Sequence, residues 1–233
     1  MANEIVLIVF YVGILLYSVI LHEVMHGVMA MWLGDMTAKY AGRITANPFR
    51  HIDPWLTIGM PFLMLIITNF KFAFGGAKPV PYNPYNLRDQ RWGPAWVALA
   101  GPGSNIIIAL MAAVLAKFIA IPAAAKIDII NNIRTANWES LSLVISNSLG
   151  SIFFTILIIT IFWNVLLAVF NLIPIPPLDG SKLLFSIFSV KVETLAILEQ
   201  FGFIILLFVV FVFNAPIAFV LNLFWILFFN ITI

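Results

Sequence analysis

The chain has no cysteine and only 9% charged residues among its 233 residues, and each shortage excludes a class of function. Without cysteine there is no disulfide, no thiolate nucleophile and no sulfur ligand, so a metal ion would have to be held by His, Asp, Glu or Asn. The twelve Lys and Arg residues stand singly and leave a net charge of +2. Because no basic patch is available to neutralise phosphates, nucleic acid is not expected as a partner.

Apolar residues are what the chain has in excess. They make up 63% of the sequence and give a mean hydropathy of +1.07, whereas the apolar share of a water-soluble domain is nearer half. A helix of about 20 apolar residues crosses the hydrocarbon core of a bilayer. We therefore expect an all-α polytopic membrane protein, a bundle of about five transmembrane helices in the lipid bilayer. The predicted spans are residues 4–33, 94–121, 148–173, 195–213 and 217–230.

Residues 54–70 form a further apolar stretch that is short and contains Pro61, so it either spans the bilayer or enters and leaves by one face. If it is re-entrant, the loops at 34–53, 71–93 and 174–194 share one side and hold nine of the twelve basic residues. Loops rich in Lys and Arg face the cytoplasm, so this alternative is favoured. The re-entrant alternative places the N-terminus on the outer side of a cell membrane and the active site toward the cytoplasmic side. The first apolar stretch has no basic leading region or small-residue cleavage site and is expected to be retained as a helix.

The stretch "LHEVMHGVMA" places His22, Glu23 and His26 inside the first apolar segment. On a helix, residues four positions apart project from the same face, so the two imidazoles can share one metal ion. Glu23 lies one step round the helix, within reach of a water that such a metal activates. The alternative is a chance pattern, but ionisable residues within a membrane segment are expensive and usually functional. This arrangement is typical of metal-assisted peptide hydrolysis.

Two histidines are too few for a catalytic zinc ion, which usually has three protein ligands. A third ligand must lie at the same membrane depth, near the inner end of another span. The span at 148–173 ends in "FNLIPIPPLDGSKLL", and Asp179 is the carboxylate near that end. The prolines leave non-helical backbone at membrane depth, which is tolerated where it lines a watery cavity. The alternative is that Asp179 only caps a helix that starts near Ser181.

Several motifs together resemble the site-2 protease family of intramembrane zinc metalloproteases, in its compact prokaryotic form without a PDZ domain. They are "HEVMH", "AGPGSN" at 100–105 and "NLIPIPPLDG" at 171–180, supported by "AGRITANPFRHIDPW" and "GGAKPVPYNPYNLRD". The resemblance implies one Zn²⁺ held by His22, His26 and Asp179, with Glu23 as the catalytic acid and base. Asn171 matches a residue thought to position substrate or stabilise the oxyanion. The implied partner is a transmembrane segment of a membrane-tethered protein, cut by regulated intramembrane proteolysis.

Three weaker features remain open. His51 either donates to the transition state or forms a local hydrogen bond beside Asp53, and Asn105 either contacts substrate or links helices. Gly75 and Gly76 precede a proline-rich stretch that is expected to be irregular or β-like and close to the active site, where its edge could pair with an unwound substrate.

The sequence predicts one membrane-embedded protease domain over residues 1–233, with a core at 4–190 and further transmembrane segments at 195–230. Two alternatives are a zinc-binding scaffold without catalysis, which would be indifferent to Glu23, and an ion-coupled secondary transporter. A transporter usually shows an internal repeat, which this sequence lacks.

Overall fold

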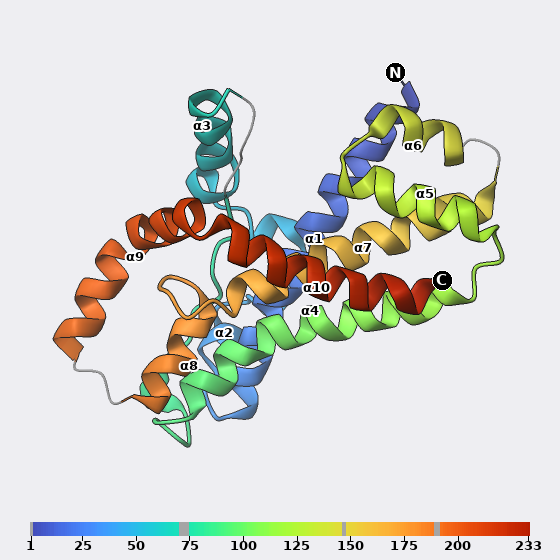
Figure 1. Ribbon diagram of the computed structural model, residues 1–233. Coiled ribbons are helices and arrows are strands. Elements are labelled where there is room, and N and C mark those ends of the chain that lie inside the picture. Colours follow the sequence, from blue (N-terminus) through green and yellow to red (C-terminus); the bar gives the residue numbers. More distant parts are fainter. Residues whose placement is uncertain (1, 70–74, 146–147, 189–191) are drawn as a thin grey trace.

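The computed structural model describes residues 2–69, 75–145, 148–188 and 192–233, and within these ranges it is helical without a β-strand. Figure 1 shows the arrangement of the elements. The longer helices are α1 (Ala2–Trp32), α4 (Gly93–Lys117), α5 (Ala123–Arg134), α7 (Leu149–Asn171), α9 (Val192–Val212) and α10 (Asn214–Thr232). The shorter elements are α2 (Thr37–Tyr40), η1 (Pro48–Arg50), η2 (Pro54–Gly59), α3 (Met60–Ile67), η3 (Pro84–Asn86), α6 (Trp138–Ile145) and α8 (Asp179–Ile187).

Four helices of the described chain are long and apolar enough to cross a membrane: α1 from Glu4, α4, α7 and α10. The prediction of a polytopic helical bundle is therefore confirmed. The expected span at 195–213 corresponds to α9, in which Gln200–Val212 is a continuous apolar stretch of the described residues. Residue 213 interrupts the helix, and in Figure 1 α10 continues away from the end of α9 instead of folding back on it. The chain therefore has a kink here, shortly before Pro216.

The apolar stretch 54–70 begins with the π-helix η2, followed by α3, and the two together cover Pro54–Ile67. A helix of this length extends about 20 Å, which is less than a bilayer core. The amide of Gly76 donates to the carbonyl of Leu56 at 3.1 Å, and Thr57 Oγ1 donates to the carbonyl of Gly76 at 2.8 Å. The chain thus returns close to the point where it left, as a re-entrant segment must. Figure 1 shows α3 standing away from the bundle.

Helix α4 lies at the centre of the bundle and contacts α1, α7, α8 and α10. Its buried positions are mostly small residues, including Gly101, Ala109 and Ala113, which let neighbouring helices approach closely. Helix α7 ends at Asn171, just before the proline-rich turn, because Pro174, Pro176 and Pro177 cannot continue it. This turn leads directly into α8, whose first residue is Asp179. The packing therefore brings the end of α7 and the start of α8 against α1.

Candidate metal centre

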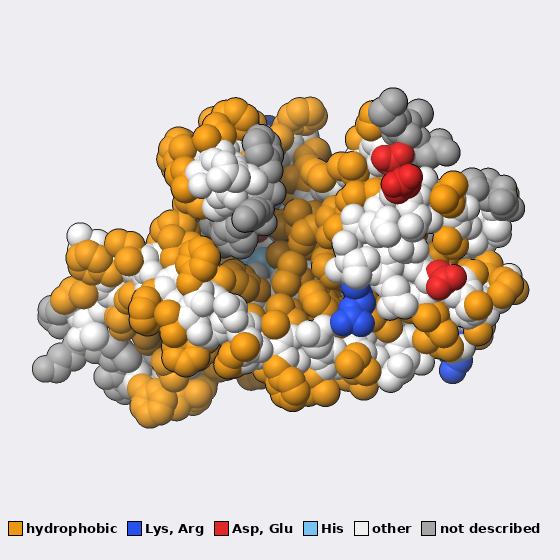
Figure 2. Space-filling model, turned by 45° about the horizontal axis from the view of Figure 1, so that its top comes forward, with side chains coloured by type: hydrophobic (Ala, Val, Ile, Leu, Met, Phe, Trp, Pro, Cys, Tyr) orange, Lys and Arg blue, Asp and Glu red, His pale blue; other side chains and the backbone are white. Residues whose placement is uncertain are grey.

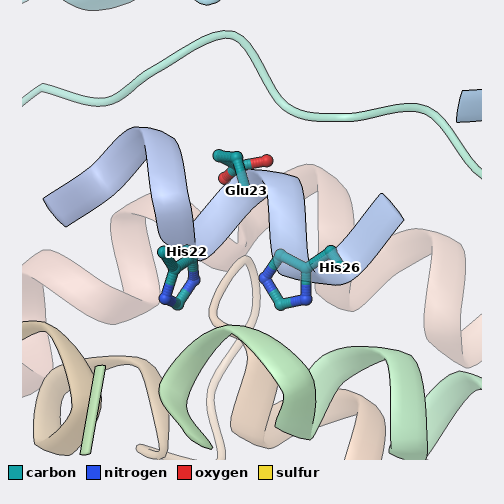
Figure 3. A group of neighbouring side chains, drawn as sticks. All are labelled: His22, Glu23 and His26. Carbon is teal, nitrogen blue, oxygen red and sulfur yellow. The ribbon is translucent and has the colours of Figure 1, made fainter. Parts of the chain in front are cut away.

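The two histidines of α1 face the same neighbouring helix. Figure 3 shows His22 and His26 projecting side by side toward α4, with Glu23 on an adjoining side of α1. Their ring centroids are 4.7 Å apart, and the side chains are buried, with exposed fractions of 5% and 9%. The spacing of four residues on a continuous helix accounts for this geometry.

Asp179 meets both histidines, although it is 157 positions from His22 in the sequence. Its Oδ2 lies 3.1 Å from the Nε2 atom of His22 and 3.1 Å from that of His26. Lys182 Nζ lies 3.8 Å from the other carboxylate oxygen. Asp179 does not cap α8. Leu178 is the N-cap residue of this helix, and no side-chain hydrogen bond caps it.

The protonation of Asp179 follows from its surroundings. Burial alone would raise the pKa of this carboxyl group, but hydrogen bonds with His22 and His26 outweigh it and hold the pKa well below its usual range. The group is therefore a carboxylate near neutral pH, which is the form that binds metal ions.

The second nitrogen of each imidazole is also engaged. His22 Nδ1 lies 2.6 Å from Oδ1 of Asn105, and His26 Nδ1 lies 2.7 Å from the carbonyl of Val97. Because a carbonyl only accepts hydrogen bonds, each Nδ1 carries a proton. A protonated imidazole donates from Nε2 to Asp179, whereas a neutral imidazole has its lone pair on Nε2, where a metal ion can bind. Orientation of a ligating imidazole by such a partner is a general feature of metal sites.

These donors fit a zinc ion. In a tetrahedral site with metal–ligand distances of about 2.1 Å, neighbouring ligand atoms are about 3.4 Å apart, close to the 3.1 Å separations observed here. The opposite wall of the site is Gly101 of α4. A Cβ atom at Gly101 would lie 2.5 Å from the His26 ring and 2.7 Å from the His22 ring, so the imidazoles occupy space that only glycine leaves open.

Glu23 is held by a different partner. A carboxylate oxygen of Glu23 lies within 4.8 Å of a ring nitrogen of both histidines, and its Oε2 accepts a hydrogen bond of 2.9 Å from the amide of Val80. Val80 packs close to Gly27 of α1, where an added Cβ would be 2.9 Å from a Val80 methyl carbon. The close approach of residue 80 to α1 therefore fixes one end of the Glu23 carboxylate and leaves the other oxygen free to act as a base.

Residues 75–83 run as an extended segment along this side of the site, without forming a strand. Both backbone groups of Lys78 are hydrogen-bonded. Its amide donates to the carbonyl of His51 at 2.8 Å, and its carbonyl accepts from the Arg43 guanidinium at 2.6 Å. Since backbone groups alternate along an extended chain, the groups of residues 77, 79 and 81 face the other edge. Two of these are prolines, so that edge offers mainly carbonyl acceptors.

The surface opens toward the site in two ways. Figure 2 looks into a hollow lined by hydrophobic side chains, with a histidine visible at its base. A groove of about 500 Å³ also runs along α1 beside α4 and α7. Its lining on α1 extends from Val9 to Leu21, one residue before His22. The groove thus approaches the candidate centre along α1, although His22, His26 and Asp179 do not line it.

Comparison with known proteins agrees with this geometry. Residues 10–209 match the model of peptidase family M50. The chain belongs to peptidase family M50. It is 32% identical over 194 residues to YwhC of Bacillus subtilis, a candidate zinc metalloprotease, covering 83% of this chain and 76% of YwhC. It is 29% identical over 191 residues to Rip2 of Mycolicibacterium smegmatis, also a candidate zinc metalloprotease, covering 82% of this chain and 62% of Rip2. No solved structure matches the chain.

Membership in family M50 confirms the prediction of an intramembrane zinc protease and does not favour the scaffold or the transporter. The remaining predicted site residues occupy distinct positions around the centre of this M50 peptidase. Asn171 is half-buried in the last turn of α7, where its Nδ2 donates to the carbonyl of Leu167. Asn105 is fully buried against His22. His51 is 1% exposed, and its Nε2 lies 2.8 Å from the carbonyl of Thr45 rather than beside Asp53.

Sequence reasoning missed Asp35, which is fully buried just after α1. Its carboxylate accepts hydrogen bonds from the amide of Asn83 at 2.7 Å, from Nδ2 of Asn86 at 2.9 Å and from the backbone amide and the hydroxyl of Thr37. The turn residues Gly34-Asp35 after the helix were the signal available in the sequence. Asp35 ties the end of α1 to the end of the extended segment that carries Val80.

We expect Asp35→Ala to lower the free energy of unfolding by about 3 kcal/mol, because several buried donors lose their acceptor. Burial raises the pKa of Asp35, but these hydrogen bonds outweigh it and lower the pKa below its usual value. Its contribution is therefore present above about pH 4 and is lost as the pH falls through the folded-state pKa. Denaturation of the detergent-solubilised protein at neutral and acidic pH measures this. Asp128→Ala, at an exposed position of α5, is the control and should change stability by less than about 0.5 kcal/mol.

Proposed function

We propose that the chain is an HExxH-type zinc endopeptidase that holds one zinc ion with His22, His26 and Asp179 and cuts transmembrane segments of other proteins. The observation that carries the proposal is the convergence of Asp179 Oδ2 on both Nε2 atoms at 3.1 Å. Two imidazole nitrogens and a carboxylate oxygen that converge in a buried position are a suitable donor set for a metal cation. Family membership and the names of the relatives support zinc as that cation.

When bound, zinc supplies a Lewis acid that polarises the peptide carbonyl and makes a water molecule more acidic. Glu23 then acts as the general base. Its carboxylate accepts a proton from the water that attacks the carbonyl carbon, and it passes this proton to the amide nitrogen as the C–N bond breaks. The amide of Val80 holds Oε2 during both transfers, so the other oxygen is the one that moves the proton.

The remaining polar residues have separate roles in this proposal. Asn171, at the end of α7, positions substrate or stabilises the oxyanion. Asn105 orients His22 instead of contacting substrate, because its amide is fully buried against the imidazole. His51 braces the loop that supports Lys78 rather than donating to the transition state.

The substrate is a transmembrane segment that approaches along the apolar groove beside α1. It must unwind locally, because a helix hides its scissile carbonyls in internal hydrogen bonds. The extended segment at residues 75–83, which reaches Glu23 through the amide of Val80, would pair with the unwound backbone.

The whole chain acts as one membrane-embedded domain, with its N-terminus outside a cell membrane and the metal centre toward the cytoplasm. The support for this orientation is the concentration of basic residues in the loops at 34–53, 71–93 and 174–194. Cysteine labelling from either side of the membrane tests it, since the chain has no native cysteine.

The test of the function is cleavage of a transmembrane peptide by the purified protein in detergent, with zinc content measured in parallel. We expect a chelator to abolish cleavage and added Zn²⁺ to restore it. His22→Ala and Asp179→Ala should both lose zinc and cleavage together, because each removes one of three ligands. Asp128→Ala is the matched control for Asp179→Ala and should behave as the wild type. Cleavage that persists without zinc, or full zinc content in the Asp179→Ala protein, would contradict the proposal.

A further inference from the structure

A chain of buried polar side chains lies behind His22 and crosses three helices. Asn105 of α4 accepts from His22 Nδ1 at 2.6 Å, and its Nδ2 donates to Oδ1 of Asn164 on α7 at 2.7 Å. Asn164 Nδ2 donates to Ser18 Oγ on α1 at 2.9 Å and to the carbonyl of Thr160 at 2.9 Å. Both asparagines are fully buried, and Ser18 is 4% exposed.

The direction of this chain is set at its far end. A backbone carbonyl accepts and never donates, so the carbonyl of Thr160 must face the NH₂ group of Asn164. The Asn164 oxygen then faces Asn105, so the NH₂ group of Asn105 must lie on that side and donate to this oxygen. The Asn105 oxygen is left facing His22, and Nδ1 of His22 must carry the proton. Each step follows because the opposite orientation would place two acceptors or two donors in contact.

The consequence reaches the metal centre. An imidazole that carries its proton on Nδ1 has its lone pair on Nε2, the atom that faces Asp179. If the Asn105 amide were reversed, its NH₂ group would face Nδ1 and the proton would move to Nε2, which could then no longer bind a metal ion. Two acceptors fix the NH₂ group of Asn105: Oδ1 of Asn164 at 2.7 Å and, at the longer distance of 3.4 Å, the carbonyl of Ser18. The shorter bond, to Asn164, is the stronger source of the preference.

We propose that Asn164 is a positioning residue of the metal centre, which acts through Asn105 to keep Nε2 of His22 available for zinc. This inference rests on the assignment of His22 as a ligand in the proposed function. A buried network with every member satisfied is suited to this task, because in a membrane interior no water can replace a lost partner.

The first test is the zinc affinity of the full-length Asn164→Leu protein, measured by competition with a chelator. Leucine has a similar volume but cannot accept from Asn105, so we expect zinc to bind about tenfold more weakly, as for other partners of ligating histidines. The visible spectrum of the Co²⁺-substituted protein should also change, because the His22 ligand is no longer uniformly oriented. Asn164→Ala removes the same acceptor without adding volume and replaces the leucine variant if that protein does not fold.

Thr155→Val is the control for general damage to α7. Thr155 is 1% exposed and its hydroxyl donates within its own helix, to the carbonyl of Ser151 at 2.8 Å. It takes no part in the chain that ends at His22. We expect its zinc affinity and Co²⁺ spectrum to match those of the wild type.

The second test separates orientation from packing. In Asn105→Asp, either carboxylate oxygen can accept from His22 Nδ1, so the orientation of residue 105 no longer matters. Adding Asn164→Leu to this variant should not lower zinc affinity by more than about twofold. Unchanged affinity in the Asn164→Leu single variant, or an equal loss in both backgrounds, would overturn the inference. Failure of the proposed function is distinguishable, because in that case His22→Ala itself would leave zinc affinity unchanged.

Discussion

Glu23→Gln should abolish cleavage while leaving zinc bound. Glutamine has the shape of glutamate, and its oxygen can still accept the hydrogen bond from the amide of Val80, so the local structure should persist. It cannot accept a proton from water or return one to the leaving nitrogen. The loss of general acid–base catalysis corresponds to a decrease in rate of about 10²- to 10⁴-fold. Cleavage of a transmembrane peptide and metal content by mass spectrometry are the two measurements.

The control for this prediction is the same substitution at an exposed glutamate, Glu139→Gln in the first turn of α6. It should cleave at the wild-type rate. A Glu23→Gln protein that cleaves as fast as Glu139→Gln would remove Glu23 from the mechanism. Loss of zinc from Glu23→Gln would instead make Glu23 part of the metal site.

Gly101→Ala should empty the metal centre, although residue 101 has no side chain and binds nothing. The added Cβ atom would lie 2.5 Å from the His26 ring and 2.7 Å from the His22 ring, closer than carbon atoms approach in proteins. Both imidazoles are also fixed through Nδ1, so they cannot move away without losing those hydrogen bonds. We expect zinc affinity to fall by at least tenfold and cleavage to fall with it.

Gly103→Ala provides the matched control on the same helix, because a Cβ atom there has no neighbour within 4 Å. It should retain zinc and activity. Since both variants place alanine in α4 two positions apart, a change in helix propensity affects them equally. Equal zinc affinity in the two proteins would mean that Gly101 does not shape the centre.

The sequence predicted much of the metal centre because its signals are local or nearly so. The positions of His22 and His26 on one face follow from helix periodicity, and Glu23 follows from the same motif. Asp179 could be predicted as the third ligand because the prolines after residue 173 end α7 at a defined depth. The re-entrant segment was favoured by the distribution of basic residues, and the hydrogen bond between Gly76 and Leu56 agrees with it.

Other features depend on contacts that no local pattern encodes. Asn105 was ambiguous between substrate and helix packing, because its partner His22 lies 83 positions away. His51 was open between a transition-state donor and a local hydrogen bond, and its partner in the structure is local, the carbonyl of Thr45. Asp35 and Asn164 attracted no interpretation, since single polar residues in a sequence carry no sign of what they face.

Composition and periodicity alone determined that this chain is a helical membrane protein, that two imidazoles and a carboxylate lie close together on one helix, and that Asp179 lies just beyond the end of a span. Only the tertiary structure decided how closely α4 approaches the imidazoles, which amide holds Glu23 and how His22 is oriented. The physical reason is that helix geometry repeats every few residues, whereas the choice of hydrogen-bond partner inside a bundle depends on how distant helices pack against each other.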